Sequence, residues 1–283
     1  NVPRGTIKNK QKSMEVIDHF LSKKKFTVQP SSRSGILETA PKPSSKDLPK
    51  YYKSKEYLSH NKNGSFFSKL YSLAKRLNFF LKLKHLRKHS SSLNTLLDFG
   101  SGDGFFIAEL NKNRIDAHGY EPLFNSTAPN TYKQKDLLLS FDKAYFDVIT
   151  MWHSLEHVES YSKTITFLKP LIKSKGLLVI ACPNFQSWEA RYYKEFWAGY
   201  DVPRHLWHFS PKGLVSYLEQ NGFLLIKQKS MYMDSFYVCM LSEKYKGAKL
   251  WFLKGFCVGL FSTFVSFFTK SFSSTMFVFK NQI

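Results

Sequence analysis

The sequence is poor in cysteine and in acidic residues. Only three of its 283 residues are cysteine. Cys182, Cys239 and Cys257 show no paired spacing, which excludes a disulfide framework and indicates a reducing compartment. The first residues carry charge but lack the apolar core of a signal peptide, which argues against secretion. We therefore expect a cytoplasmic protein.

Acidic residues number 21 against 42 basic ones, which leaves a formal net charge of +21. Such a charge favours contact with an anionic partner, whether nucleic acid, phospholipid or an acidic substrate. A lysine-rich solvated surface explains it equally well, because the basic residues are scattered, with denser stretches at 8–25 and 82–88. No accessory RNA-binding module is evident, so nucleic acid is a less favoured partner that the charge keeps open.

Three glycines at alternate positions, Gly100, Gly102 and Gly104, follow a short apolar run that ends in Asp98. Glycine takes backbone angles that Cβ forbids and lets a ligand approach the main chain closely. A strand that ends in such a bend, with a helix opening behind it, is typical of a nucleotide site. The G-x-G-x-G spacing is not the G-x-G-x-x-G of dinucleotide folds, and the absence of G-K-[ST] argues against a triphosphate.

This segment resembles motif I of the class I S-adenosylmethionine-dependent methyltransferases, an acid followed by G-x-G-x-G. Later landmarks occur in the same order, with apolar strands at 146–151 and 176–184, and the resemblance covers about residues 85–235. It implies S-adenosylmethionine as cofactor and S-adenosylhomocysteine as product. Glu121 would hold the ribose hydroxyls, since a carboxylate accepts two hydrogen bonds from a cis-diol, and Asp136 would meet the adenine amino group. The implied cofactor contacts are Asp98, Gly100, Ser101, Gly102, Gly104, Glu121, Asp136, Leu137, Trp152 and His153.

The predicted fold is α/β, a Rossmann-like, doubly wound, seven-stranded mixed sheet with an antiparallel last strand near 274–280. Helices are expected at 163–173 and 211–221. Residues 64–90 are expected to form a helix that caps the cofactor site or simply packs on the sheet. We divide the chain into an N-terminal appendage and linker, 1–60, and a methyltransferase domain, 61–283, with an apolar insertion at about 236–272.

The appendage resembles a degenerate zinc ribbon of bacterial methyltransferases. Ser31 and Ser34 stand where the second cysteine pair of such a ribbon would be, and Asn1 and Arg4 where the first would be. A structural zinc ion needs four nitrogen or sulfur ligands, so we expect no zinc.

The insertion contains an almost wholly apolar stretch, 250–268, interrupted by Lys254. Its length approaches that of a membrane span. The charge inside it, and the need to keep the last strand in the sheet, favour an amphipathic helix or hairpin on the domain surface. Core or dimer packing, a peripheral contact with the inner membrane face and a true span remain alternatives, and the oligomeric state is open.

Two polar clusters are candidates for chemistry. The first, H-x-x-E-H, follows the fourth strand and contains His153, Glu156 and His157. It resembles the E-x-x-E-H of quinone O-methyltransferases and small-RNA end methyltransferases, which in several of them binds a divalent ion. His153, Glu156 and His157 are therefore weak candidates for metal ligands, and His157 alone is a candidate base. The alternative is a helix cap that orders the cofactor loop.

The second cluster lies at 199–210 and contains Asp201, Arg204, His205 and His208. His205 and His208 join His157 as candidate catalytic bases. Arg204 could grip an acidic group of the acceptor together with Asp201, or the two could form a structural ion pair. Trp188 is expected to wall the same pocket.

These patterns predict S-adenosylmethionine-dependent methyl transfer to a small-molecule acceptor through oxygen or nitrogen, with a glycan, lipid or quinone-type precursor as examples. The alternatives are an RNA methyltransferase and a non-catalytic scaffold that keeps the fold. The sequence does not identify the acceptor.

Overall fold

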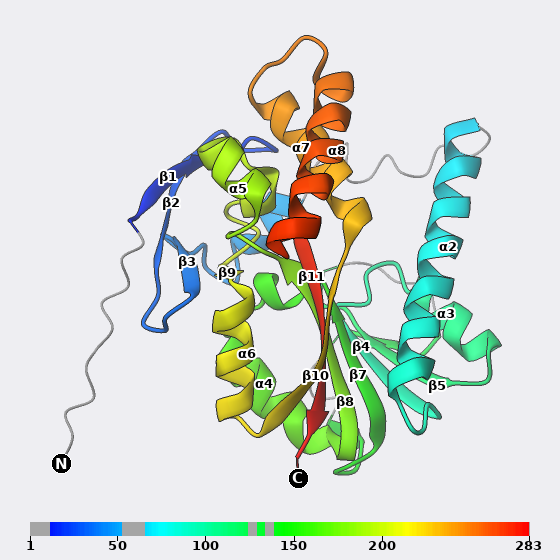
Figure 1. The fold of residues 1–283 in the computed structure, drawn as a ribbon. Coiled ribbons are helices and arrows are strands. Elements are labelled where there is room, and N and C mark those ends of the chain that lie inside the picture. Colours follow the sequence, from blue (N-terminus) through cyan, green and yellow to red (C-terminus); the bar gives the residue numbers. More distant parts are fainter. Residues whose placement is uncertain (1–11, 53–65, 124–128, 134–138, 283) are drawn as a thin grey trace, which may run out of the picture.

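A computed structural model of the chain describes residues 12–52, 66–123, 129–133 and 139–282. Its centre is a seven-stranded sheet in which one strand, the second from one edge, runs antiparallel to both of its neighbours and the other pairs are parallel. This arrangement confirms the predicted mixed sheet with an antiparallel last strand (Figure 1). In spatial order the strands are β10 (Phe223–Ser230), β11 (Ser274–Asn281), β8 (Ile172–Pro183), β7 (Phe146–Trp152), β4 (Thr95–Phe99), β5 (Asp116–Tyr120) and β6 (Thr131–Tyr132).

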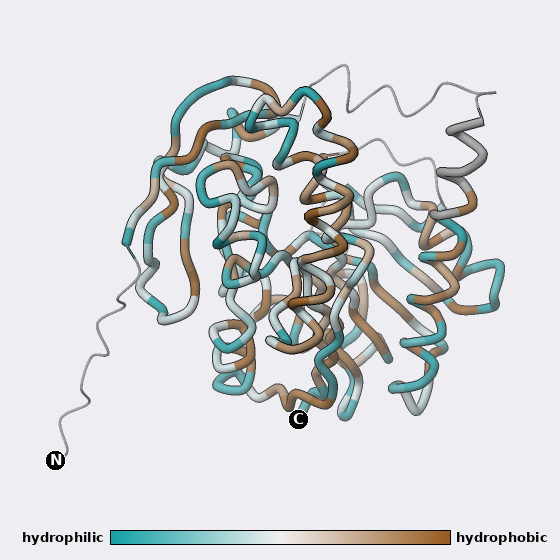
Figure 2. Tube along the Cα trace, turned by 45° about the horizontal axis from the view of Figure 1, so that its top comes forward, coloured by the Kyte–Doolittle hydropathy of each residue, from teal (hydrophilic) through white to brown (hydrophobic). Residues whose placement is uncertain are grey.

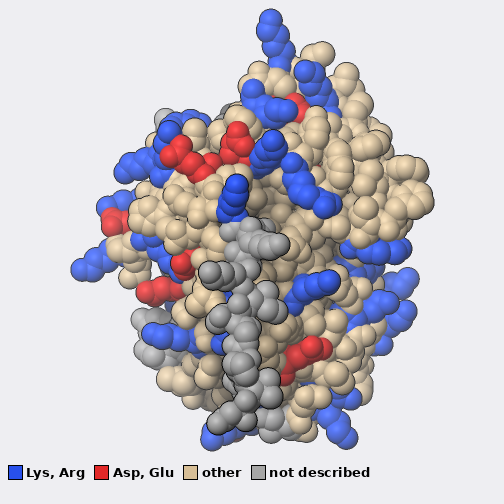
Figure 3. Space-filling view, turned by 60° about the vertical axis from the view of Figure 1, so that its left-hand side comes forward, with Lys and Arg blue, Asp and Glu red and all other residues tan. Residues whose placement is uncertain are grey.

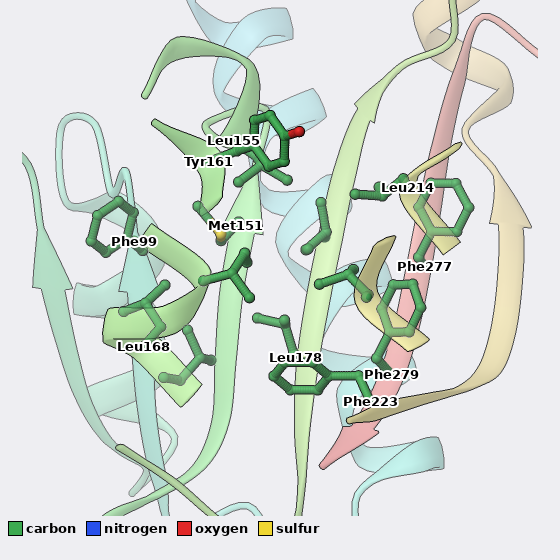
Figure 4. Close-up of a cluster of buried hydrophobic side chains, with 14 of the residues drawn as sticks. Phe99, Met151, Leu155, Tyr161, Leu168, Leu178, Leu214, Phe223, Phe277 and Phe279 are labelled. Atoms are coloured by element: carbon green, nitrogen blue, oxygen red, sulfur yellow. The ribbon is translucent and has the colours of Figure 1, made fainter. Parts of the chain in front are cut away.

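Helices cover both faces of this sheet, as expected for parallel strands that are apolar on both sides. Helices α2 (Phe66–His89) and α3 (Phe105–Lys112) lie on one face, and α4 (Tyr161–Leu168) and α6 (Pro211–Gln220) on the other (Figure 1). Each face has its own cluster of buried apolar side chains. The α4–α6 cluster joins residues of β4, β7, β8 and β11 to both helices (Figure 4).

The helix predicted at 163–173 is shorter than expected. Helix α4 ends at Leu168, a 3-10 turn follows at Lys169–Leu171, and β8 begins at Ile172. The turn contains Pro170, whose nitrogen cannot donate the next helical hydrogen bond. Helix α6 begins as predicted, because the Ser210 hydroxyl accepts a hydrogen bond from the Gly213 N–H at 3.0 Å.

A second, four-stranded sheet joins three N-terminal strands to one strand from much later in the chain. It has the order β1 (Met14–Ile17), β2 (Lys25–Pro30), β3 (Ile36–Ala40) and β9 (Trp207–Phe209). The N-terminal strands are therefore completed by a strand from the second polar cluster. Ser31 and Ser34 lie at the turn between β2 and β3, whereas Asn1, Arg4 and the boundary at residue 60 lie outside the described residues, so the ribbon comparison and the domain division stay predictions.

The predicted insertion is a helical hairpin of α7 (Tyr232–Tyr245) and α8 (Trp251–Thr269), with the short helix α5 (Trp188–Tyr193) against it. It stands between β10 and β11 and projects beyond the sheet (Figure 1). Because β10 and β8 are both antiparallel to β11, β10 runs in the direction of the parallel strands. The hairpin therefore starts at the carboxyl edge of the sheet, where ligand sites of such sheets lie.

Candidate functional site

The glycine bend after β4 exposes its main chain. Gly100, Gly102 and Gly104 all have positive φ values, of 93°, 57° and 77°. A Cβ on Gly100 would lie 2.4 Å from the Cβ of Ser154, in the loop after β7, whereas a Cβ on Gly102 would meet nothing within 4 Å. The bend is thus packed on one side and open on the other, which is the geometry that close approach of a ligand requires.

Glu121 faces this bend from the end of β5. Its side chain is buried, and its Oε2 accepts a hydrogen bond from the Gly102 N–H at 3.0 Å while its Oε1 accepts one from the Leu123 N–H at 2.8 Å. A carboxylate has about four lone-pair positions, so it can hold the bend and still accept hydrogen bonds from a diol. The adenine-side residues Asp136 and Leu137 lie outside the described residues.

A cleft of about 200 Å³ lies against the bend. The structure brings several predicted cofactor residues together there, and helix α2 supplies others that sequence reasoning did not name. Gly104 belongs to the bend as the N-terminal cap of α3, and Glu121 is joined to the bend by its hydrogen bond with Gly102. The cleft is lined by Asp98, Gly100, Ser101, Gly102 and Trp152, by Lys75, Asn78, Phe79 and Lys82 of α2, and by Asp103, Phe105 and Phe106.

Asp98 lies at the floor of the cleft and is nearly inaccessible to solvent. The Thr150 hydroxyl donates a hydrogen bond of 2.6 Å to its Oδ1. Burial raises the pKa of Asp98 to about 7, and this effect outweighs the opposing effects of Thr150 and of the Lys82 ammonium. The Nζ of Lys82 lies 4.3 Å from the centre of the Trp152 ring, where a cation is attracted to the indole face. The cleft thus holds a carboxyl group, Asp98, together with two lysines, Lys75 and Lys82.

Charges of alternating sign lead from this cleft toward the first polar cluster. Lys82 interacts with both Asp98 and Asp234, a residue of α7. The Nε2 of His153 lies 3.2 Å from an oxygen of Asp234, and its Nδ1 lies 3.4 Å from Oε1 of Glu156. Burial alone would lower the pKa of His153, but these two carboxylates raise it to about 10, so His153 is an imidazolium cation at neutral pH.

Glu156, His157 and His205 form a group, called here the Glu156 group, in which Glu156 and His205 are buried and His157 is half-buried. One ligand atom from each lies within 4.8 Å of the others. The Nδ1 of His157 lies 3.0 Å from the Arg204 carbonyl oxygen, and the Nδ1 of His205 lies 2.9 Å from the Gly199 carbonyl oxygen. A carbonyl only accepts, so in the neutral ring each Nδ1 carries the hydrogen and each Nε2 keeps a lone pair. The Nδ1 of His157 also lies 2.9 Å from the Tyr52 hydroxyl oxygen, which can accept the same hydrogen.

The electrostatics of the Glu156 group favour a neutral His157 beside a charged Glu156. Burial is the largest cause that lowers the pKa of His157, to about 4. Burial raises the pKa of Glu156, but its contact with the His153 imidazolium outweighs burial and keeps that pKa below its usual value. Among the described residues, neither carboxylate oxygen of Glu156 has a hydrogen-bond partner, and Oε1 has the longer contact of 3.4 Å with His153. Two imidazole nitrogens and a carboxylate are a set of ligands that fits a divalent metal ion.

The remaining candidates of the second cluster are engaged inside the protein. His208 is buried, and its Nε2 lies 3.0 Å from the Thr39 hydroxyl. Because that hydroxyl donates its hydrogen to the His205 carbonyl oxygen, it accepts a hydrogen bond from the His208 Nε2. His208 is not part of the Glu156 group. Trp188 lies apart from both sites, stacked on Tyr192 and against Phe261 of α8.

Arg204 is buried beneath the N-terminal strands. Its guanidinium donates to both oxygens of Asp201, at 2.6 and 2.9 Å, to Asp18 at 3.2 Å and to the Tyr51 carbonyl oxygen at 3.2 Å. These are the contacts of the ion pair that the sequence offered as one of two roles for Arg204. Asp18 could not be foreseen, because it stands 186 residues away in the sequence.

The comparison with protein families agrees with this geometry. A family model described as a methyltransferase domain matches residues 48–228. No curated protein sequence matches the chain. Similar solved structures include a methyltransferase from Archaeoglobus fulgidus, 18% identical with a TM-score of 0.44, which covers 72% of this chain and 94% of that chain.

Two further structures have known acceptors in their names. Geranyl diphosphate C-methyltransferase from Streptomyces coelicolor is 13% identical, with a TM-score of 0.47 and coverage of 72% and 77% of the two chains. Phosphoethanolamine N-methyltransferase 2 from Haemonchus contortus is 14% identical, with a TM-score of 0.45 and coverage of 71% and 52%. The family match spans more than half of the chain and contains the glycine bend, Glu121 and the Glu156 group. The chain therefore belongs to the methyltransferase domain family, with the sheet order and glycine bend of the class I S-adenosylmethionine-dependent enzymes.

Proposed function

We propose that the protein transfers the methyl group of S-adenosylmethionine to an oxygen or nitrogen atom of a small-molecule acceptor, such as a glycan, lipid or quinone-type precursor. The observation that supports this most is the Glu156 group, which places two imidazole rings and a carboxylate at the end of a chain of charges that starts in the cofactor cleft. A scaffold without catalysis has no need for such a group.

The residues of the cleft suit each part of this cofactor, whose sulfonium supplies an activated methyl group. Ionised Asp98 would accept hydrogen bonds from the amino group, and Glu121 would accept them from the ribose hydroxyls. Lys82 and Lys75 line the cleft as cations for the carboxylate.

The Glu156 group would serve the acceptor. An alcohol or amine loses a proton when it is methylated, and a neutral imidazole with a free Nε2 can accept that proton. The hydrogen bonds from Nδ1 to the backbone fix the ring orientation of His157 and His205. His208, with its Nε2 used by Thr39, is proposed to support the group rather than to take the proton.

The same group would alternatively hold a divalent ion through Glu156, His157 and His205, and such an ion would polarise an acceptor oxygen. Titration of Mn²⁺, Zn²⁺ or Mg²⁺ into the protein separates the two modes. Binding that is lost in Glu156→Gln assigns the metal mode, and turnover that survives chelation assigns the direct base. We propose no zinc in the N-terminal strands.

The proposed function is tested first by calorimetric titration with S-adenosylhomocysteine, and absence of binding at millimolar ligand would end it. The second step measures transfer of a labelled methyl group to pools of small acceptors. The double variant His157→Ala, His205→Ala is expected to bind the cofactor as well as wild type and to lose turnover. A variant that keeps full turnover would exclude the Glu156 group from the reaction.

A further inference from the structure

Helix α8 buries its small residues and exposes its large ones. Gly255, Gly259, Ser262 and Ser266 recur at spacings of four, three and four residues and are the buried residues of the helix. Gly255 lies so close to α7 that a Cβ on it would come within 2.4 Å of the Met240 Cα. Small residues that let two helix backbones approach closely are typical of helix pairs that pack in an apolar solvent.

The opposite side of α8, called here the α8 outer face, is apolar and unusually exposed. Its large side chains are between 43% and 74% exposed, and only Lys254 interrupts them with a charge. The helix is long and apolar enough to cross a membrane, yet only 22% of its 18 most apolar consecutive residues are buried. Figure 2 shows the apolar stretch along the hairpin. The α8 outer face consists of Phe252, Leu253, Phe256, Leu260, Phe261, Phe264, Phe267 and Phe268.

Basic residues surround this face. Lys249 and Lys254 stand at the start of α8, Lys270 stands just past its end, and all three are exposed. On the face seen in Figure 3, Lys and Arg outnumber Asp and Glu, including at the top of the view, where the hairpin projects. A second copy of the chain would bring the same lysines, and another net charge of +21, against this surface. Anionic lipid headgroups complement both the lysines and the charge.

Lipid cannot surround the hairpin on all sides. Ser262, at the middle of α8, donates a hydrogen bond of 2.8 Å to the Glu189 carboxylate of α5, which belongs to the catalytic domain. Helix α7, packed along α8, carries Asp234 and Glu243. A span through the bilayer would take these carboxylates into hydrocarbon at a high cost. The α8 outer face can enter a membrane only sideways, with the helix parallel to its surface.

We infer that the α8 outer face docks the protein on an anionic lipid membrane, with the aromatic and leucine side chains in the acyl boundary and the flanking lysines at the headgroups. The inference goes beyond the proposed methyl transfer and does not depend on it. The hairpin starts at the carboxyl edge of the sheet, the edge that also carries the glycine bend.

The test is flotation of the full chain, without cofactor, with vesicles of phosphatidylcholine alone and of phosphatidylcholine mixed with phosphatidylglycerol. Wild type is expected to float with the anionic vesicles and to be released by salt only in part. The variant Leu253→Gln, Leu260→Gln, Phe264→Gln is expected to lose more than roughly tenfold in affinity, because three exposed apolar side chains no longer leave water. Glutamine preserves helix propensity.

The matched control is Leu139→Gln, Leu224→Gln, which removes two exposed leucines away from the hairpin and is expected to float like wild type. Circular dichroism establishes that both variants are folded. Failure of wild type to float with anionic vesicles, or equal binding to neutral ones, overturns the inference. So does a dimer seen by light scattering that the α8 variant converts to monomer, because the face would then be occupied by a second copy.

Discussion

Cofactor binding should depend steeply on pH through Asp98. The pKa of this carboxyl is raised from 3.8 to about 7 by its burial, and the difference corresponds to about 4 kcal/mol. A carboxyl with a raised pKa stabilises the fold below its ordinary pKa, and this contribution is lost as the pH rises through about 7. The ammonium group of a bound cofactor would reverse the preference of Asp98 for its neutral form, because it stabilises the ionised carboxylate.

The affinity for S-adenosylhomocysteine should therefore fall by about tenfold for each pH unit below 7 and level off above it, as expected when binding displaces one proton. Calorimetric titration from weakly acidic to weakly alkaline pH measures this slope. Repetition in buffers of different ionisation enthalpy counts the released proton. The variant Asp98→Asn should bind more weakly and lose the slope. An affinity of the wild type that does not change with pH, or a slope that persists in Asp98→Asn, would refute the reasoning.

Two further predictions concern stability. Arg204→Met leaves the carboxylates of Asp18 and Asp201 without their shared cation, so it should lower the free energy of unfolding by about 3–5 kcal/mol. Urea unfolding at neutral pH measures this loss. A loss below about 1 kcal/mol would show that the ion pair is dispensable. Gly255→Ala places a methyl group against the backbone at Met240. It should lower the melting temperature of the hairpin region, despite the better helix propensity of alanine. Unchanged hydrogen exchange in the hairpin of this variant would contradict the close packing.

The sequence was most informative where the backbone itself sets the structure. The alternate glycines predicted the bend after β4, because few other residues tolerate the φ values found at Gly100 and Gly104. The strands of the parallel sheet were readable as apolar runs, since their two buried faces leave little room for polar residues. The start of α6 was readable from Ser210 and Pro211, which act locally.

The candidate site was predictable only in part, because its polar contacts cross the fold. Asp234 and Lys82 come from helices far from the glycine bend in sequence, and no local pattern marks either one. The first cluster forms a 3-10 turn, Leu155–His157, instead of opening a longer helix. His153 therefore turns to Asp234 as well as Glu156, while His205 from the second cluster completes the group.

The ion pair of Asp18 with Arg204 and the pairing of β3 with β9 set a lower limit on the length of chain that can fold into a working domain. The stretch recognised as the family domain, 48–228, begins after β3 and stops within β10. A protein trimmed to that stretch would keep β9 as a bare edge, leave Arg204 one carboxylate short and lack β11, which sits between β8 and β10. The smallest autonomous unit is thus longer at both ends than the region that carries the family signature. Contacts that hold the second polar cluster in place, from Asp18 to Arg204 and from Thr39 to His208, come from residues before that region.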